Sequence, residues 1–281
     1  MNKLDTYIRS ALHPVCSGTE AAWLSRIICC EMLGQSPTDY YLGKDMDLSS
    51  AQKEKVDDVV RRLRSHEPIQ YIQGTARFCG RDFSVSPDVL IPRPETEELV
   101  ELILRENTVS SPSVLDVGTG SGCIAISLKL ALPAAPVRAF DISAAALRVA
   151  ATNADRLHAD VAFEEHDIFS FDPTVGSARS LDLLVSNPPY VACREKQDMQ
   201  PCVLDWEPAT ALFVPDDDPL LYYRRIAQVG RVMLKSGGRL YFEINRAYGS
   251  DVASLLTDMG YRDVLVRKDL SGNDRFVSAT L

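Results

Sequence analysis

Residues 113–122 read Ser-Val-Leu-Asp-Val-Gly-Thr-Gly-Ser-Gly, and they decide the fold class of this 281-residue chain. The first five form a short, mostly apolar run typical of a buried strand, and the apolar residues 123–128 behind the glycines are typical of a helix. Glycines in such a turn let the backbone approach a ligand closely, and the following helix start presents free N–H groups. The segment therefore predicts a strand, a binding loop and a helix. The candidate cofactor-binding residues are Gly118, Thr119, Gly120, Ser121 and Gly122.

The glycine spacing is G-x-G-x-G and differs from the G-x-G-x-x-G of dinucleotide-binding folds, because Cys123 stands at the last glycine position. A tightly packed pyrophosphate is therefore less well supported than a cofactor with a carboxylate or amino acid end.

Polar residues also follow the next two expected strands. Asp141 ends the first of these, and a carboxylate there can accept hydrogen bonds from both hydroxyls of a ribose. The alternative is a cap for a helix over residues 143–153. Asp167 and Ile168 follow the second, where a polar side chain can contact an adenine amino group while the isoleucine packs on the ring. A simple strand-to-loop turn explains this pair equally well.

Another strand-like run, residues 181–186, ends in Asn187-Pro188-Pro189-Tyr190. Carboxyl ends of strands open onto the ligand crevice of an α/β sheet, so these four residues face whatever is bound there. The asparagine offers one acceptor and two donors, the prolines fix the backbone, and the tyrosine supplies a flat ring. Such a group suits a planar amide or amine, which would donate its hydrogens to Asn187 and the Pro188 carbonyl. The alternative is a proline-rich turn.

Strands and helices alternate from residue 113 onward, which predicts an α/β fold with a mainly parallel sheet covered on both faces. The last two expected strands are separated by too few residues for a crossover helix, so they should form an antiparallel hairpin at one edge. The expected strands are residues 113–117, 137–141, 161–165, 181–186, 239–244, 262–267 and 274–280.

The part before residue 75 is organised differently, because apolar residues recur there at helical spacing. Ser49 and Gln52 form a capping-box pattern, whereas Pro37 and Gly43 are typical of loops. We expect a small N-terminal helical bundle that helps to hold a protein substrate, although a purely structural cap is the alternative. The expected divisions are a docking domain over residues 1–74, a hairpin linker over 75–92 and a catalytic domain over 93–281.

Two other segments need a separate interpretation. Pro94 can begin a helix whose first turn holds Glu95, Glu97 and Glu98, which the helix dipole favours without any function. Residues 191–219 are too long and polar for a simple connector, and we interpret them as a flap that contacts the substrate.

Composition limits the class of protein further. The net charge of -9 argues against nucleic acid as the main partner, because a duplex-binding enzyme normally needs a basic face. None of the seven cysteines forms a C-x-x-C pair, which indicates reduced thiols in a cytoplasmic protein. The four histidines lack ligand spacing, and no apolar run approaches a membrane span. We therefore expect a cytoplasmic monomer without a metal site, membrane contact or direct nucleic acid contact.

Together these motifs resemble the class I methyltransferases that use S-adenosylmethionine. The closer resemblance, over nearly the whole chain, is to the release factor glutamine methyltransferases of the HemK family. The segments that carry it are residues 67–74, 83–85, 90–97, 185–190, 207–208 and 211–212.

The resemblance implies a seven-stranded, Rossmann-like sheet with a C-terminal antiparallel hairpin and S-adenosylmethionine as cofactor. It also implies methylation of the side-chain amide nitrogen of the glutamine in the Gly-Gly-Gln loop of peptide chain release factors. By the same resemblance Asn187, Pro188 and Tyr190 are catalytic, Asn187 also meets the cofactor, and Pro189 and Arg93 line the substrate pocket. The resemblance also implies that residues 91–97 lie beside the cofactor and shape the entrance to the substrate pocket, which we favour over a helix start without function. Some members carry an aromatic residue at the position of Ile168.

Two rival functions stay open. An Asn-Pro-Pro-Tyr motif also occurs in enzymes that methylate an exocyclic amine of a nucleic acid base, although the acidic composition argues against such a substrate. A nucleotide-binding oxidoreductase or an inactive binding module would use the same sheet but leaves Asn187 unexplained. Binding of S-adenosylmethionine rather than a nicotinamide dinucleotide distinguishes the methyltransferase from the oxidoreductase.

Overall fold

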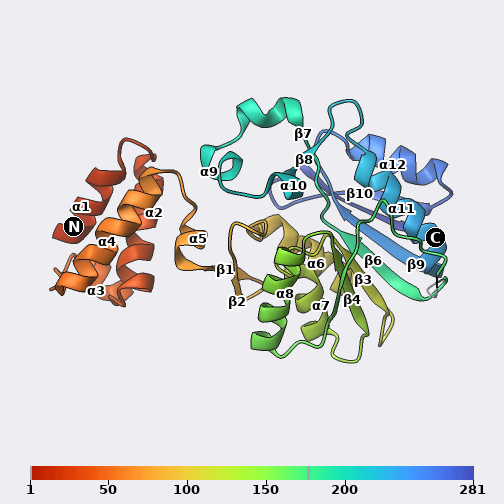
Figure 1. Ribbon diagram of the computed structural model, residues 1–281, viewed down its shortest axis with the longest axis horizontal. Coiled ribbons are helices and arrows are strands. Elements are labelled where there is room, and N and C mark those ends of the chain that lie inside the picture. Colours follow the sequence, from red (N-terminus) through yellow and green to blue (C-terminus); the bar gives the residue numbers. More distant parts are fainter. Residues whose placement is uncertain (1, 176–177) are drawn as a thin grey trace. The chain divides into compact units, whose positions relative to one another are not determined.

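The computed structural model describes residues 2–175 and 178–281 and divides the chain into two compact units (Figure 1). The helical unit consists of Met1–Gly74 and Gln200–Trp206, and the sheet unit consists of Thr75–Met199 and Glu207–Leu281. Residues 200–206, which the sequence placed within the domain 93–281, therefore group with the N-terminal helices. No helix of the described ranges is long and apolar enough to cross a membrane.

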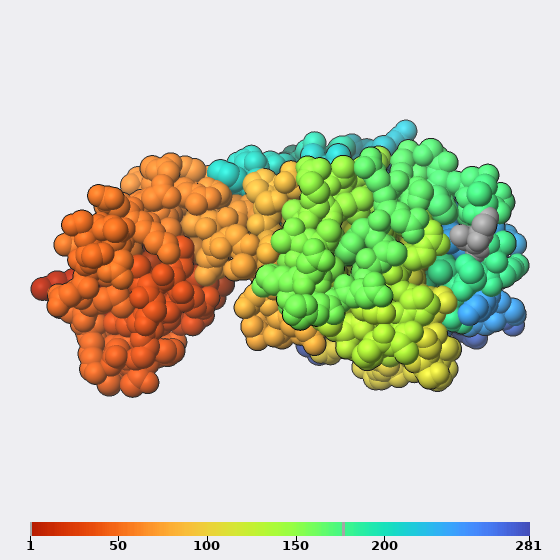
Figure 2. All heavy atoms as spheres, turned by 60° about the horizontal axis from the view of Figure 1, so that its bottom comes forward, coloured from red at the N-terminus to blue at the C-terminus, as the bar shows by residue number. Residues whose placement is uncertain are grey.

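The helical unit is a bundle around its own apolar core, and Figure 2 shows its N-terminal helices as one contiguous red to orange body. Ser49 and Gln52 form the expected capping box, with each side chain bonded to the backbone N–H of the other residue. Pro37, expected in a loop, instead begins a short helix, because proline suits the first helical position and Ser36 caps the turn. The elements are α1 (Lys3–Leu12), α2 (Gly18–Arg26), the π-helical turn η1 (Ile27–Met32), α3 (Pro37–Tyr41), α4 (Ser50–Arg64) and α5 (Ile69–Gln73).

Residues 200–206 belong to this unit through a short helix and a tryptophan contact. The helix α9 (Pro201–Leu204) is followed by Trp206, whose indole Nε1 donates to the Ser65 carbonyl oxygen at 3.1 Å. The chain thus leaves the sheet unit after Met199 and returns to it at Glu207.

A hairpin opens the sheet unit, with strands β1 (Thr75–Phe78) and β2 (Arg81–Ser84) as the sequence predicts. The Asn153 side chain accepts from Ser84 N at 2.7 Å and donates to the carbonyl oxygens of Ser84 and Ser121, both at 3.0 Å. This buried amide therefore joins the hairpin to the glycine loop.

Within the described residues the central sheet has seven strands in the order β10-β11-β9-β6-β3-β4-β5. The strands from β9 to β5 in this order are parallel to their neighbours, and β11 pairs antiparallel with both β9 and β10, as expected of the terminal hairpin. The bounds are β3 (Val114–Val117), β4 (Val137–Asp141), β5 (Ala162–Glu165), β6 (Leu181–Ser186), β9 (Leu234–Glu243), β10 (Arg262–Lys268) and β11 (Asp274–Thr280).

Helices cover both faces of the sheet, because neighbouring strand residues point to opposite sides (Figure 1). Val114 belongs to the apolar cluster that contains residues of α6, α7 and α8, whereas Leu115 belongs to the cluster that contains residues of α11 and α12. The helices are α6 (Pro94–Glu106), α7 (Cys123–Ala131), α8 (Ala144–Leu157), α11 (Leu221–Met233) and α12 (Gly249–Asp258). Between β6 and α11 the chain adds β7 (Val191–Ala192), the 3-10 helix η2 (Cys193–Asp198), α9, α10 (Ala209–Leu212) and β8 (Phe213–Val214).

Candidate active site

The site lies where the strand order reverses. From β3 the chain continues to β4 and β5 on one side, and β6 then pairs with β3 on the other side. Val117 and Ser186 are partners in the parallel register, and the buried Ser186 hydroxyl donates to Val117 O at 2.6 Å. Gly118 and Asn187 therefore leave the sheet side by side, at the position where α/β sheets bind ligands.

The glycine loop needs its glycines for backbone geometry. Gly122 has a φ of 80°, and a Cβ on it would lie 2.8 Å from Ile126 Cδ1 and 3.1 Å from Ala150 Cβ. Gly118 has a φ of 75° but faces open space. The loop thus packs closely against α7 and α8 at Gly122 and is open at Gly118. This leaves room for a ligand beside Gly118.

Asp141 is bound to the glycine loop by its side chain. Its Oδ2 accepts from Gly120 N at 2.9 Å, and its Oδ1 accepts from Ser143 N at 2.9 Å. The helix cap considered from the sequence belongs to Ser143, whose hydroxyl accepts from Ala146 N at 3.1 Å. Burial raises the pKa of Asp141, while the two backbone N–H groups favour its charged form. The carboxylate is therefore oriented toward the pocket that it lines.

Asp167 and Ile168 both line the pocket but differ in setting. Asp167 Oδ1 accepts from Phe169 N at 2.9 Å, so its carboxylate also holds the local turn. Ile168 is 8% exposed and packs in the core beneath α11, and its carbonyl oxygen accepts from Arg225 Nε at 2.8 Å. The side chain of Ile168 forms part of a fixed apolar wall of the pocket.

The Asn187 to Tyr190 segment divides between the pocket and the core. Asn187, Pro188 and Pro189 line the pocket, and Asn187 Nδ2 donates to Thr96 Oγ1 at 3.3 Å. Tyr190 is not part of the described lining and packs against the core on the α11 side. Its hydroxyl donates to the buried carboxylate of Glu243 at 3.2 Å, so its position gives it a supporting rather than a stacking contact.

Arg93 lines the pocket with its charge already paired. Its guanidinium forms an ion pair with Glu207, whose other carboxylate oxygen accepts from Ile91 N at 3.2 Å. Glu207 is 5% exposed, and it is the first residue after the chain returns from the helical unit. The ion pair and the hydrogen bond of Glu207 thus connect the loop before α6 to the segment that follows residues 200–206.

A strongly buried acid lies beneath the glycine loop. Asp116 is fully buried on β3, and the Thr119 hydroxyl donates to its Oδ2 at 2.7 Å. Burial raises the pKa of this carboxyl to about 7, mainly because a charge there lacks solvent. The group therefore holds a proton over a pH range in which an exposed aspartate is ionised.

The glycine loop, the ends of β4 and β5, Arg93 and the Asn187 to Pro189 turn surround one open pocket. Its described lining carries the carboxylates of Asp88, Asp141 and Asp167, while Arg93 is paired with Glu207. The described residues contain no cluster of three or more His, Cys, Asp or Glu side chains placed to hold a metal ion. Lining residues not singled out from the sequence include Val89, Ile142, Phe169, Tyr222 and Thr210.

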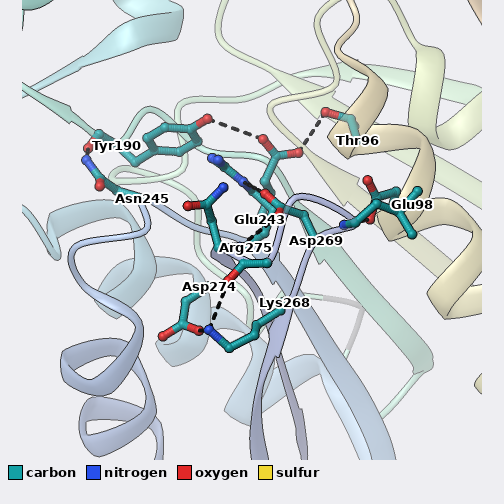
Figure 3. A network of polar contacts seen from close by, with 12 residues as sticks. Thr96, Glu98, Tyr190, Glu243, Asn245, Lys268, Asp269, Asp274 and Arg275 are labelled. Carbon is teal, nitrogen blue, oxygen red and sulfur yellow. Dashed lines mark hydrogen bonds and ion pairs between the residues drawn. The ribbon is translucent and has the colours of Figure 1, made fainter.

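Two polar residues near Asn187 had no individual role from the sequence, although Thr96 lies in the segment 90–97 that carries the resemblance. Thr96 lies in the first turn of α6, and Glu243 ends β9 (Figure 3). Glu243 directly follows the apolar run 240–242, and this position was the available signal. Acids are rarely buried in strands without a partner, so a carboxylate there indicates a buried polar contact.

Two family models match the chain: Methyltransferase small domain over residues 95–202 and PrmC N-terminal domain over residues 9–74. A protein of Bacteroides thetaiotaomicron named Release factor glutamine methyltransferase is 52% identical over 279 residues, which is 99% of each chain. A protein of the same name from Flavobacterium psychrophilum is 43% identical over 243 residues, 85% of this chain and 84% of its own.

Among solved structures, a methyltransferase from Pyrococcus furiosus aligns with a TM-score of 0.54 at 14% identity. It covers 83% of this chain and 98% of its own. At this identity the likeness concerns the fold alone.

Proposed function

The chain belongs to the release factor glutamine methyltransferase family, and we propose that it methylates the glutamine of the Gly-Gly-Gln loop in peptide chain release factors with S-adenosylmethionine. The methyl group would go to the side-chain amide nitrogen. The observation that carries this proposal is the position of Asn187, beside the glycine loop and in the same pocket.

The chemistry of the pocket fits S-adenosylmethionine. Its described ionisable lining is mainly acidic, which suits the positive sulfonium and amino groups of this cofactor and opposes a polyphosphate. Asp141 is oriented by Gly120 and Ser143 to accept from ribose hydroxyls, and Ile168 offers an apolar surface for the adenine. When bound, the cofactor supplies an electrophilic methyl group. This lining favours a methyltransferase over a nucleotide-binding oxidoreductase.

The acceptor needs orientation because an amide nitrogen is a weak nucleophile. In the proposed arrangement Asn187 Oδ1 and the Pro188 carbonyl accept the two amide hydrogens, which points the nitrogen at the methyl group. The N–C bond would form as the S–C bond of the bound cofactor breaks, and the nitrogen would then release one proton. Holding reacting atoms in such an arrangement can lower the barrier by roughly 7–11 kcal/mol. The proposal requires no strong base, because the nitrogen is cationic once it is methylated and then loses its proton readily.

Arg93 and Tyr190 take indirect parts in this proposal. The ion pair of Arg93 with Glu207 braces the pocket wall formed by residues 91–94, so Arg93 shapes the entrance more than it offers a free charge. Tyr190 supports the acceptor site through Glu243.

Methyl transfer from labelled S-adenosylmethionine to purified release factors tests the proposal. We expect one methyl group, which mass spectrometry should locate on the glutamine of the Gly-Gly-Gln loop. A factor with alanine at that glutamine is the control and should stay unlabelled. Preferential labelling of DNA or RNA, or of another residue in the factor, would overturn the assignment.

A further inference from the structure

A chain of hydrogen bonds runs from Asn187 through Thr96 to Glu243 in the protein interior. Figure 3 shows the part from Thr96 to Glu243. Asn187 Nδ2 donates to Thr96 Oγ1 at 3.3 Å, and Thr96 Oγ1 donates to Glu243 Oε2 at 2.7 Å. Thr96 is 2% exposed and Glu243 is 1% exposed. The three residues come from the end of β6, the first turn of α6 and the end of β9, so only the folded sheet unit brings them together.

The order of donors in this chain determines which end of the Asn187 amide faces the pocket. An ionised carboxylate only accepts hydrogen bonds, so Thr96 must give its single hydroxyl proton to Glu243. The Thr96 oxygen is then an acceptor toward Asn187, and only the NH₂ end of the amide satisfies it. The carbonyl oxygen of Asn187 is consequently the end left for a ligand in the pocket.

Neighbouring groups supply the carboxylate of Glu243 with hydrogen bonds and a positive charge. The Tyr190 hydroxyl donates to its second oxygen at 3.2 Å, and Arg275 on the adjacent strand β11 places a positive charge near it. Asp269 holds Arg275 through an ion pair between Nε and Oδ2 at 3.2 Å. Burial raises the pKa of Glu243 above its ordinary value, and the contacts with Thr96, Arg275 and Tyr190 offset this rise in part and favour the ionised, accepting form.

We propose that Thr96 and Glu243 fix the Asn187 amide with its oxygen toward the substrate, so that the site selects glutamine and rejects glutamate. The inference rests on the proposed function. A glutamine amide brings hydrogens that this oxygen accepts, whereas a carboxylate brings only acceptors and would leave it unpaired. Sites built on such hydrogen bonds discriminate strongly against analogues that lack the matching group. Both are positioning residues, because they act through Asn187.

Kinetics of Thr96 variants test the orientation. Thr96→Val keeps the shape but removes the hydroxyl, so kcat on a release factor should fall by about 10- to 100-fold. The affinity for S-adenosylhomocysteine should stay within about twofold of the wild type, because Thr96 acts on the acceptor. Thr96→Ser keeps the hydroxyl and should restore most of kcat. Glu101→Gln changes an exposed acid of the same helix and is the control.

A release factor with glutamate in place of the loop glutamine tests the selectivity. Wild-type enzyme loaded with S-adenosylhomocysteine should bind the glutamine form about tenfold or more tightly than the glutamate form. In Thr96→Val the ratio should move toward one, because the freed amide can turn its NH₂ group to the carboxylate. Thr96→Ala carries the same expectation if the valine variant does not fold.

The outcomes separate this inference from the proposed function. No methylation of the factor by the wild type removes the proposed function. Methylation by the wild type together with an unchanged kcat in Thr96→Val, or an unchanged binding ratio in both hydroxyl-deleting variants, removes only the orienting role. A fall in kcat that Thr96→Ser does not reverse also contradicts it.

Discussion

Gly120 N–H donates to Asp141 Oδ2 at 2.9 Å, which makes the glycine loop and the end of β4 one structural unit. Ser143 N–H holds the other carboxylate oxygen at the same distance. Each oxygen retains a further lone pair, so both can still accept from ribose hydroxyls. The backbone therefore fixes the direction of this carboxylate before any cofactor is bound.

Asp141→Ala should weaken cofactor binding by roughly 1.5–3 kcal/mol, because hydrogen bonds to a charged acceptor are lost. Calorimetry with S-adenosylhomocysteine measures this directly. Asp160→Ala, at an exposed position of the same unit, should bind normally. Unchanged affinity in Asp141→Ala with only a lower melting temperature would reduce Asp141 to a structural role.

Asn187→Ala should abolish detectable methyl transfer while changing cofactor affinity only modestly. Loss of one positioned polar contact of this kind costs roughly 2.7–4 kcal/mol in comparable sites. Turnover assays on an intact release factor, paired with calorimetry, separate the two effects. Near-normal turnover would refute the role given to Asn187.

Gly122→Ala should destabilise the protein more than Gly118→Ala. Both residues have positive φ, so an added Cβ introduces strain of roughly 1–2 kcal/mol at either position. At Gly122 the new atom also meets Ile126 and Ala150, which adds overpacking of about 1–3 kcal/mol. Urea unfolding without cofactor compares the two variants, and equal losses would show that the contact with Ile126 relaxes freely.

Asp116→Asn should change how stability depends on pH. The folded-state pKa of Asp116 is raised to about 7, whereas the unfolded chain titrates at about 3.9. Between these values the folded state keeps a proton that the unfolded state has released, so this group lowers wild-type stability as pH rises. The asparagine does not titrate, so the variant does not lose stability in this way. The difference in free energy of unfolding, variant minus wild type, should therefore increase by a few kcal/mol from about pH 4 to about pH 7. Urea unfolding across this range measures the difference, and a constant difference would contradict the raised pKa.

The helical unit should contribute to the recognition of an intact release factor and not of a short peptide. Leu42 is 68% exposed at the end of α3, and Leu42→Ala should raise KM for the factor while leaving a Gly-Gly-Gln peptide unaffected. Leu270→Ala, which changes a leucine that is 92% exposed in the sheet unit, is the matched control. Equal KM for the factor in both variants argues against docking at this end of α3.

The sequence predicted the elements whose signals are local. The apolar runs and glycines around residues 113–122 specified a strand, a loop and a helix, and the short spacing between the last two strands specified a hairpin. The strand expected at 239–244 begins instead at Leu234, because the register with β6 shifts between Leu181 and Leu183 and the glycines at 237 and 238 accommodate the irregularity.

Partners distant in sequence could not be predicted in this way. Thr96 and Glu243 are 147 positions apart, and Arg93 and Glu207 are 114 apart. Each of these residues looks ordinary in its own segment: the threonine suits a first helical turn and the arginine an exposed loop. The strand order places β9 beside β6, and this brings Glu243, the last residue of β9, close to the end of β6. The grouping of residues 200–206 with the helical unit likewise depends on contacts such as that of Trp206 with Ser65.

The contacts of Asn187 come from several elements of the fold, so the Asn187 to Tyr190 segment cannot be transferred to another protein by itself. The four residues Asn187 to Tyr190 are contiguous, yet the partner of the asparagine comes from α6, the acid behind it from β9 and the compensating charge from β11. Grafted onto another parallel sheet, the tetrapeptide would reproduce the backbone turn but leave the amide free to rotate. If the proposed orientation holds, an engineered amide methyltransferase needs the threonine, the glutamate and the arginine as part of the graft.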